Sequence, residues 1–413
     1  MHFSSILTPK VLSAIFEPIL WVAWRRGYGK HIVLSKVKSI IIFRCDEIGD
    51  VVLTTPLLRE IRRNAPDAWI TLVVKPSIKN LVEMCPYVNE VLVYDWVALL
   101  PDNWRCSSEM LNRFKRMVKF CRWFLWRKKF DLAVLPRWAA DYYDSTYLAY
   151  LCGARHRIGH SQSVNIKKAT LNGGFDYLLT EVVSDTSAKH QVEHNLDILR
   201  HLGGEVGSSR LEAWLTTEDE MFAQTRVGRN GQNRADIVVG LGLGAGWEYK
   251  VWPAEYFCEI SRWLAGTIGA KVVLLGGVAD IPTGRAIVGA IGNAAINVVG
   301  QTTLRQTAAI LKHCDVFVGN DSGPMHLASI FNLPIIAIFS EARRSDIGPD
   351  YAPAWFRPWH APHTVIQPDM PLPPCSDGCS DLKSHCIRQI KPEIVIKSLE
   401  KFIEGVKGRT GQQ

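Results

Sequence analysis

Short hydrophobic runs alternate with longer segments of helical periodicity along the first half of the chain. The runs lie at Ser39–Arg44, Trp69–Val74, Glu90–Tyr94 and Phe130–Leu135, and a helical segment follows the first run from about Gly49 to Asn64. Continuous hydrophobic strands separated by helices are typical of a parallel sheet that crossover helices cover on both faces. The first half therefore predicts a doubly wound α/β domain.

The same alternation begins again after a polar segment. Residues Gly203–Asn233 are rich in Gly, Ser and polar side chains, which is typical of a domain end and a linker. Beyond them, strands are predicted at Asp236–Leu241, Lys271–Leu275, Ala295–Val299, Val316–Val318 and Pro334–Phe339. Helices are predicted at Pro253–Ile268, Pro282–Ile291, Leu304–Cys314 and Gly323–Phe331. We therefore expect two Rossmann-like domains that face each other across a cleft, with ligands at the carboxyl ends of the strands.

The 413 residues are enough for two domains of about 150–200 residues each. We expect an N-terminal helical extension at 1–37, a first domain at 38–215, a linker at 216–235, a second domain at 236–395, and a C-terminal helix and tail at 396–413. The apolar stretch Val11–Trp24 is shorter than the ~20 residues of a membrane span, and no small-residue cleavage site follows it. The stretch predicts a helix, followed in sequence by Arg25 and Arg26. This helix either lies on the surface of an anionic membrane or packs on the first domain.

Composition and charge narrow the class of partner. Hydrophobic residues make up 47% of the chain and charged residues 21%, which indicates a globular protein. The net charge of +8 favours acidic partners such as nucleotides, phosphorylated lipids or an anionic membrane. The chain contains no nucleic-acid-binding motif, so we expect no nucleic-acid partner.

The ten cysteines fall into two groups. Seven are scattered through hydrophobic segments and are interpreted as buried side chains of a reduced protein. Cys375, Cys379 and Cys386 cluster near the C-terminus, with His385 beside them. A zinc site usually has a tighter Cys-x-x-Cys pair and four ligands, and adjacent His385 and Cys386 make shared ligation awkward. A metal site and an ordinary Cys-bearing loop both remain open.

Asp50 is the first candidate for chemistry. It follows a predicted strand and the turn at Gly49, so it lies in the first turn of a helix at the edge of the sheet. A carboxylate there can act as a general base toward a hydroxyl in the cleft. Asp is also a preferred helix-capping residue, and the spacing alone does not separate the two roles.

Two loops of the second domain have features of phosphate-binding sites. In the first, glycines including Gly246 follow a strand and precede Lys250, so that backbone amides and a cation can face a diphosphate. The alternative is an ordinary Gly-rich turn. The segment Gly240–Ala245 also fits a loose dinucleotide fingerprint, but the acidic residue expected about 20 positions later is missing.

The second loop follows the strand near Val318. Asp321, Ser322 and Gly323 stand where that strand ends and a helix begins, which directs free amides at an anion. Pro324 suits an early helical position. His326 lies in the first turn and can donate to a phosphate oxygen, or it is a satisfied core histidine.

Position alone indicates further candidates. Arg44 and Arg137 end strands of the first domain, and Asp280 follows the turn at Gly276–Gly277. Each side chain either faces the cleft or is ordinary surface charge. The segment Asp95–Lys129 is rich in tryptophan and basic residues, and it either contacts phosphorylated lipid or forms a solvated helix face. Its basic residues are Arg113, Lys115, Arg116, Lys119, Arg122, Arg127, Lys128 and Lys129.

The order of these motifs resembles glycosyltransferase family 9, the ADP-heptose:lipopolysaccharide heptosyltransferases. The resemblance extends from about Lys38 to about Phe402. Its four principal segments are Ile42–Leu58, Gly244–Pro253, Leu274–Gly277 and Gly319–Ala328. Shorter matches are Ala65–Ala68, Pro86–Val91, Gly153–Gly159 and His190–Leu196.

The resemblance implies a GT-B fold and an inverting transfer that needs no metal or other cofactor. The C-terminal domain would bind a nucleotide-diphosphate sugar, and the N-terminal domain would bind a phosphorylated glycolipid. In the family's pattern, Asp50 matches the base and Lys250 the phosphate-binding lysine. The donor-binding loop matches Asp321, Ser322, Gly323 and His326. Beside these matches, Gly246 and Asp280 remain donor candidates, and Arg44 and Arg137 remain acceptor candidates from their positions. We expect a cytoplasmic protein bound peripherally to the inner face of the inner membrane.

The chain departs from the family pattern at two places near the expected donor. Ser340, Glu341 and Ala342 replace the usual Gly-Pro-Thr, and Glu248 and Tyr249 are unusual before Lys250. Both departures leave the sugar and the nucleotide open. The alternatives are a nicotinamide-dependent oxidoreductase built on Gly240–Ala245, and a catalytically inactive binding protein of the same fold.

Overall fold

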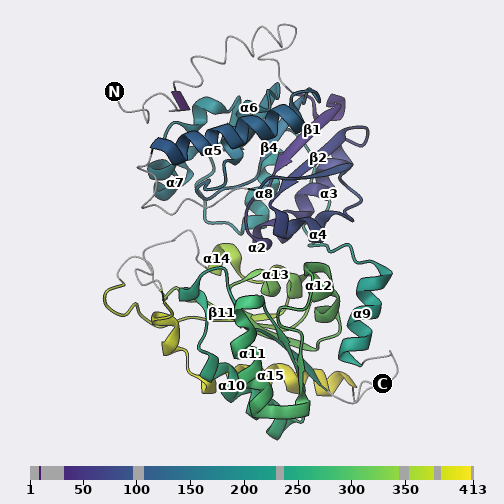
Figure 1. The fold of residues 1–413 in the computed structure, drawn as a ribbon, viewed down its shortest axis with the longest axis vertical. Helices are drawn as coiled ribbons and strands as arrows, with labels where there is room; N and C mark the ends of the chain where they lie inside the picture. The colour runs from purple at the N-terminus through teal and green to yellow at the C-terminus, as the bar shows by residue number, and fades with distance from the viewer. Residues whose placement is uncertain are drawn as a thin grey trace. The chain divides into compact units, whose positions relative to one another are not determined.

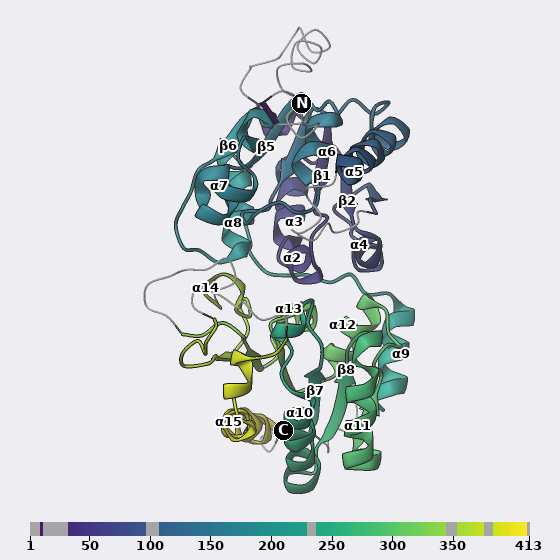
Figure 2. The same cartoon turned by 60° about the vertical axis from the view of Figure 1, so that its left-hand side comes forward.

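The computed structural model describes residues 9–10, 32–95, 107–228, 237–343, 353–375 and 383–410. The chain divides into two compact units, the first formed by Met1–Asp46 and Leu53–Ser209 and the second by Glu47–Val52 and Arg210–Gln413. Each unit contains a parallel six-stranded sheet with helices around it (Figure 1, Figure 2). The predicted pair of doubly wound α/β folds is confirmed. The helix expected at Val11–Trp24 lies outside the described residues.

The first sheet has the strand order β3-β2-β1-β4-β5-β6. The central strand β1 is buried over four of its five residues, as expected for a parallel strand covered on both faces. The strands are β1 Ser39–Phe43, β2 Trp69–Val74, β3 Glu90–Val93, β4 Leu132–Leu135, β5 His156–His160 and β6 Glu181–Val183. The order reverses direction between β1 and β4, which is where doubly wound sheets bind ligands.

The single helix expected from Gly49 to Asn64 is wrong, because the segment forms two helices. α2 spans Ile48–Val52 and α3 spans Thr55–Asn64, with Thr54 at the amino end of α3 and Pro56 in its first turn. Proline lacks the amide hydrogen that a continuous helix needs and is tolerated only in a first turn. The other helices near this sheet are α4 Lys79–Val82, α5 Ser107–Phe120, α6 Ser145–Leu151, α7 Ile166–Leu171 and α8 Gln191–His201.

The second sheet repeats the topology of the first, in the order β12-β11-β10-β7-β8-β9. Its strands are β7 Val238–Gly242, β8 Lys271–Leu275, β9 Ala295–Asn297, β10 Val316–Asn320, β11 Ile335–Ile338 and β12 His363–Ile366. Its helices are α9 Thr217–Val227, α10 Ala254–Trp263, α11 Ile281–Ile291, α12 Leu304–Lys312, α13 Gly323–Ile330, α14 Pro353–Phe356 and α15 Pro392–Thr410. The switch between β7 and β10 brings the Gly246 loop and the Ser322 loop to one edge of the sheet.

Part of the segment expected to be a linker is helical. Helix α9 begins with a capping box in which Thr216 and Asp219 exchange hydrogen bonds. It packs on α12, where Arg305 Nε lies 2.8 Å from Asp219 Oδ2 and Lys312 Nζ lies 2.6 Å from Glu220 Oε1. Segment 217–227 is therefore an integral helix of the second unit.

Candidate functional site

Lys250 and Asp321 form a buried ion pair in the second unit. Lys250 ends the 3-10 turn Glu248–Lys250 behind the Gly-rich loop, and Asp321 directly follows β10. Lys250 Nζ lies 2.6 Å from Asp321 Oδ2, and both side chains are less than a tenth exposed. Burial acts to lower the pKa of Lys250, but the charges of Asp321 and Glu341 outweigh it and hold that pKa well above its usual value. A permanent cation therefore lies at the carboxyl ends of β7 and β10.

The amino end of α13 lies beside this pair. Ser322 occupies the N-cap with extended backbone, and its side chain makes no capping bond to the helix. Ser322 Oγ instead donates to the carbonyl of Asn320 at 3.2 Å. The first amides of a helix have no acceptors within it, so the start of α13 at Gly323 can bind an anion.

His326 is a buried histidine in the first half of α13. Burial lowers its pKa, and the nearby charges of Asp321 and Asp50 only partly offset that effect. Among the described residues, its Nδ1 atom is buried without a hydrogen-bond partner. An unpartnered buried nitrogen beside a helix start favours a ligand over a satisfied core histidine.

The segment Glu47–Val52, which includes α2, groups with the second unit and packs on α13. A Cβ atom at Gly49 would lie 2.5 Å from His326 Cδ2, and one at Gly323 would lie 2.7 Å from Ile48 Cβ. Only glycine permits this approach, because real Cβ contacts are longer than 3.0 Å. The structure thus brings Asp50 and His326, which are far apart in sequence, into electrostatic contact.

Asp50 also makes a local contact of the kind that a capping residue makes. Its Oδ2 atom accepts the amide hydrogen of Glu47 at 3.3 Å, and the side chain is half-buried. A carboxylate offers about four lone-pair positions on its two oxygens, so this capping contact is compatible with a role in proton transfer.

Asn320 connects the two loops that the sequence predicts to bind phosphate, although the sequence analysis did not identify Asn320 as a candidate. Its Oδ1 atom accepts the amide hydrogen of Trp252 at 2.9 Å, while its Nδ2 atom donates to the carbonyls of Leu243 and Gly244 at 3.0 and 3.3 Å. Asn320 is a polar residue at the end of a buried strand, and this position in the sequence could have identified it as a candidate.

Glu341, one of the residues at which the chain departs from the family pattern, lies near the ion pair. Burial raises its pKa; Lys250 opposes this rise and Asp321 adds to it. Its Oε2 atom is buried without a hydrogen-bond partner among the described residues. The site therefore holds an acidic group that Lys250 does not directly neutralise.

Gly246 and Asp280 lie at the neighbouring loops. A Cβ atom at Gly246 would meet nothing within 4 Å, so the loop is open there. Asp280 Oδ2 accepts the amide hydrogen of Gly277 at 2.8 Å, and its carboxylate fills the space where side chains at Gly244 and Gly276 would lie. Asp280 thus shapes the turn after β8, beside the predicted phosphate loop.

The first unit has its own buried polar group at the carboxyl ends of β1 and β4. Arg44 is 1% exposed and its guanidinium lies 2.7 Å from Asp46. Arg137 lies 3.1 Å from the same carboxylate and over the ring of Tyr143. Because both guanidinium groups pair with the buried carboxylate of Asp46, neither arginine is an ordinary surface charge.

The buried polar group of the first unit also includes Lys168, His160 and His194. The sequence analysis did not identify these three residues as candidates. Lys168 Nζ donates to the carbonyls of Arg137 and His160 at 3.0 and 2.9 Å, and burial lowers its pKa to about 7. Burial also lowers the pKa of His194 to about 4, and its ring stacks on Trp138. The spacing from His190 to His194 was the only signal, and it does not reveal that these groups converge.

Among the described residues, one group of side chains has a composition suited to a metal, namely Cys375, His385 and Cys386. Cys379 lies outside the described residues. The expectation that neighbouring His385 and Cys386 are awkward co-ligands is wrong, because the backbone at the start of a 3-10 turn directs both side chains to one point.

Comparisons with known proteins identify the family of the chain. A model of glycosyltransferase family 9 (heptosyltransferase) matches residues 124–377, more than half of the chain. Lipopolysaccharide heptosyltransferase 2 of Salmonella typhimurium is 30% identical over 76% of this chain and 85% of that protein. Lipooligosaccharide heptosyltransferase 2 of Campylobacter jejuni (serotype O:6) is 26% identical over 44% of this chain, and the match spans 55% of that relative's length.

A solved structure supports the fold. E. coli heptosyltransferase WaaC with ADP superposes with a TM-score of 0.61 at 15% identity, over 88% of this chain and 99% of that one. Both sheets have the order expected of a GT-B enzyme, and the motif residues of each domain lie at the carboxyl ends of its strands. The chain belongs to glycosyltransferase family 9, the heptosyltransferase family.

Proposed function

We propose that the protein is an inverting glycosyltransferase that moves heptose from ADP-heptose to a lipopolysaccharide core or a related phosphorylated glycolipid. The observation that carries the proposal is the convergence of Lys250, His326 and the start of α13 with Asp50 in the second unit. This group supplies a cation, an imidazole and free amides for a diphosphate, and a carboxylate for a hydroxyl. Relatives named as heptosyltransferases, one of them solved with ADP, support the choice of donor.

The proposed reaction is a single displacement. Asp50 accepts the proton of the acceptor hydroxyl as that oxygen attacks the anomeric carbon. The bond from this carbon to the phosphate oxygen breaks, and its electron pair leaves with ADP. Lys250 and the α13 amides stabilise the charge that develops on the diphosphate. The chain has no Asp-x-Asp sequence, which agrees with a leaving group that needs no divalent ion.

The acceptor is proposed to bind the first unit near Arg44 and Arg137. The buried Arg44–Asp46–Arg137 group fixes the guanidinium of Arg137, whose side chain is 12% exposed. Lys168, with a pKa of about 7, is protonated in part near neutral pH and adds positive charge behind it. These groups suit a phosphorylated sugar.

The test is a panel of ADP-, UDP- and GDP-linked sugars with a core glycolipid, run with and without a chelator. We expect transfer from the ADP-sugar in both conditions. Activity lost in the chelator and restored by magnesium or manganese would overturn the metal-independent step. Binding of NAD but not ADP would favour the oxidoreductase, and ADP binding without transfer from any donor would favour an inactive binding protein.

Glu341 is expected to make ADP binding depend on pH. Below its raised pKa the carboxyl is neutral; as pH rises through that pKa, a negative charge forms beside Lys250 and repels the diphosphate. The ADP affinity of the wild type, divided by that of Glu341→Gln, should therefore fall several-fold with rising pH. Calorimetry across a pH series measures this ratio, from which the ionisation of ADP itself cancels. A ratio independent of pH would remove Glu341 from the donor site.

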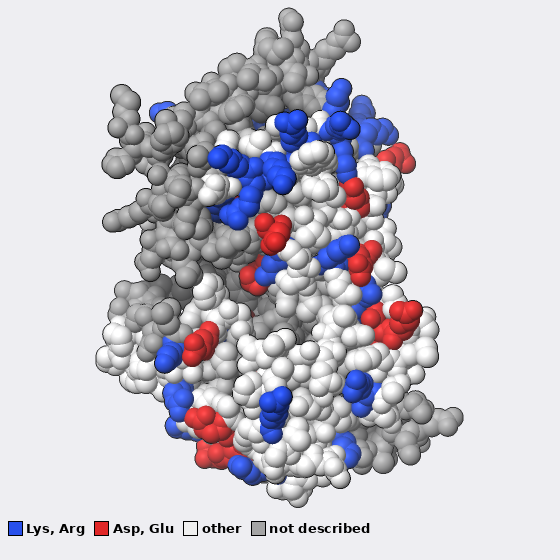
Figure 3. All heavy atoms as spheres, in the orientation of Figure 1, with Lys and Arg blue, Asp and Glu red and all other residues white. Residues whose placement is uncertain are grey.

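A basic and aromatic surface of the first unit is proposed to bind the inner membrane. After α5, the π-helical turn Cys121–Leu125 buries Cys121 and Leu125 and exposes the side chains between them. Trp123, Phe124 and Trp126 are 70%, 49% and 48% exposed. Lys and Arg side chains gather over the region of α5 in Figure 3. No described helix is long and apolar enough to cross a bilayer. We define the membrane-facing surface as Lys119, Arg122, Trp123, Phe124, Trp126, Arg127 and Lys129.

This surface should bind anionic vesicles reversibly. Basic groups near an anionic bilayer contribute about 1 kcal/mol each, and tryptophan favours the interface. In flotation at low salt, Arg122→Ser/Trp123→Ala should lower the bound fraction at least about fivefold relative to wild type. Trp69→Ala, which removes another tryptophan that is 54% exposed, is the matched control. Equal binding of wild type to neutral and anionic vesicles would contradict the proposal.

A further inference from the structure

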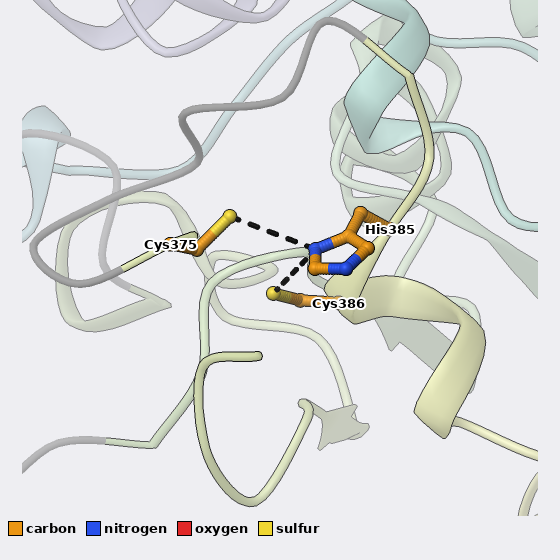
Figure 4. A group of neighbouring side chains, drawn as sticks. All are labelled: Cys375, His385 and Cys386. Atoms are coloured by element: carbon orange, nitrogen blue, oxygen red, sulfur yellow. Dashed lines mark hydrogen bonds between the residues drawn. The ribbon is translucent and has the colours of Figure 1, made fainter. Parts of the chain in front are cut away.

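Two sulfur atoms and one imidazole nitrogen meet at the start of a 3-10 turn in the second unit. His385 is the N-cap residue of the turn Cys386–Gln389, and Cys375 lies in the loop that follows β12. His385 Nδ1 is 3.7 Å from Cys375 Sγ and 3.6 Å from Cys386 Sγ (Figure 4). All three atoms lie within 4.8 Å of one another, and both cysteines are 5% exposed.

The separations of the three atoms are close to those of ligands that share one metal ion. An imidazole Nδ1 either donates one hydrogen or accepts at one lone pair, so it can satisfy only one of two sulfurs at equal range. A central ion satisfies all three atoms at once. With zinc–sulfur and zinc–nitrogen bonds of about 2.3 and 2.0 Å at a tetrahedral angle, sulfur and nitrogen lie about 3.5 Å apart. The two observed separations, 3.6 and 3.7 Å, are slightly longer than that value.

The surrounding backbone supports a ligating sulfur. The amide of Leu372 donates to Cys386 Sγ at 3.3 Å, and the amide of Cys375 donates to the carbonyl of Leu372 at 2.8 Å. Amide hydrogens directed at sulfur favour the thiolate and orient it, as partners of metal ligands commonly do. The loop at Leu372 therefore contacts Cys386 Sγ through its backbone, as a metal-binding turn does.

We propose that Cys375, His385 and Cys386 bind one zinc ion that fastens the loop after β12 to the turn Cys386–Gln389. Two sulfurs and an imidazole are a donor set that zinc prefers, and the fourth position belongs to a further ligand. The role of the ion is structural, because it fixes a turn whose residue Ile387, with the following Ile390, packs in the hydrophobic core of the second unit. The carbonyl of Ile390 accepts the indole hydrogen of Trp252 at 2.8 Å, two residues from Lys250.

The test measures the metal content of the full-length chain by mass spectrometry after dialysis against metal-free buffer. We expect about one zinc per chain in wild type, and at least about a tenfold loss in Cys386→Ser and in His385→Gln. Cys258→Ser, which removes a buried sulfur of α10 outside the group, is the matched control and should retain zinc. Cobalt added to the zinc-depleted wild type should produce a thiolate-to-cobalt charge-transfer band.

Three outcomes would overturn the site. The wild type could contain no zinc and give no cobalt band, or non-reducing peptide mapping could find a disulfide between Cys375 and Cys386. The third outcome is an equal zinc content in all variants. Circular dichroism shows whether each variant is folded; should both variants unfold, the wild-type cobalt spectrum still decides. The site does not rest on the proposed transferase function. Metal content is read without any donor sugar, and the magnesium or manganese dependence of transfer is a separate measurement.

Discussion

Replacing Asp50 with asparagine is expected to lower turnover about 100-fold or more while donor binding stays nearly unchanged. The amide cannot accept the proton of the acceptor hydroxyl, so the attacking oxygen loses its base. Asparagine still offers an oxygen to the amide of Glu47, the contact that Asp50 Oδ2 makes at 3.3 Å. The variant therefore separates the two interpretations of this residue, because it keeps the cap and removes the base.

The measurement is the single-turnover rate of transfer, with ADP affinity determined on the same preparation. Asp50→Ala provides the comparison, since it removes both the base and the cap. If Asp50→Asn turns over as fast as wild type and Asp50→Ala is merely less stable, Asp50 is a capping residue and the base lies elsewhere.

Replacing Lys250 with alanine is expected to weaken ADP binding by roughly 1.5–3 kcal/mol, the scale of a charge-assisted hydrogen bond. The pKa of Lys250 is held high by Asp321 and Glu341, so its charge persists throughout the range in which the protein can be assayed. In the variant these carboxylates face the diphosphate without their cation.

Lys271→Ala is the matched control, because Lys271 belongs to β8 and its Nζ donates to the carbonyl of Asn293 instead of an acidic side chain. The Lys250→Ala variant leaves Asp321 buried without the lysine that pairs with it. The double variant Lys250→Ala/Asp321→Ala removes both charges and therefore tests whether a loss of ADP affinity comes from the unpaired carboxylate. Calorimetry with ADP gives each affinity. Wild-type affinity in Lys250→Ala would exclude Lys250 from the donor site.

The sequence predicted strands best where both faces are buried. Strand β1 is a run of isoleucine and phenylalanine, and its position was predicted to within one residue. Strands β5, β6 and β12 were missed, because polar residues such as His156, Glu181 and His363 interrupt their hydrophobic pattern. Some of the polar residues in these strands have partners on neighbouring strands; the carboxylate of Glu181, for example, lies 3.5 Å from the ring of His156. Such pairs are visible only in the folded chain.

The ends of strands led to individual candidate residues but not to their pairing. Lys250 and Asp321 were each identified from a loop, yet their ion pair joins positions 71 residues apart. Likewise, nothing in the spacing of Gly49 predicts that its Cα lies against the ring of His326. Such contacts depend on the order of strands in the sheet, which periodicity does not determine.

The three hydrogen bonds of Asn320 have a consequence for the entropy of ligand binding. They hold the loop after β7 and the segment before α13 as one piece, so that the backbone of both loses its freedom when the chain folds. A nucleotide that contacts either loop then meets a surface that is already ordered, and little of its interaction energy is spent on ordering the protein. At the proposed donor site, the strength of nucleotide binding is in this sense determined during folding, by an amide side chain that need not touch the nucleotide.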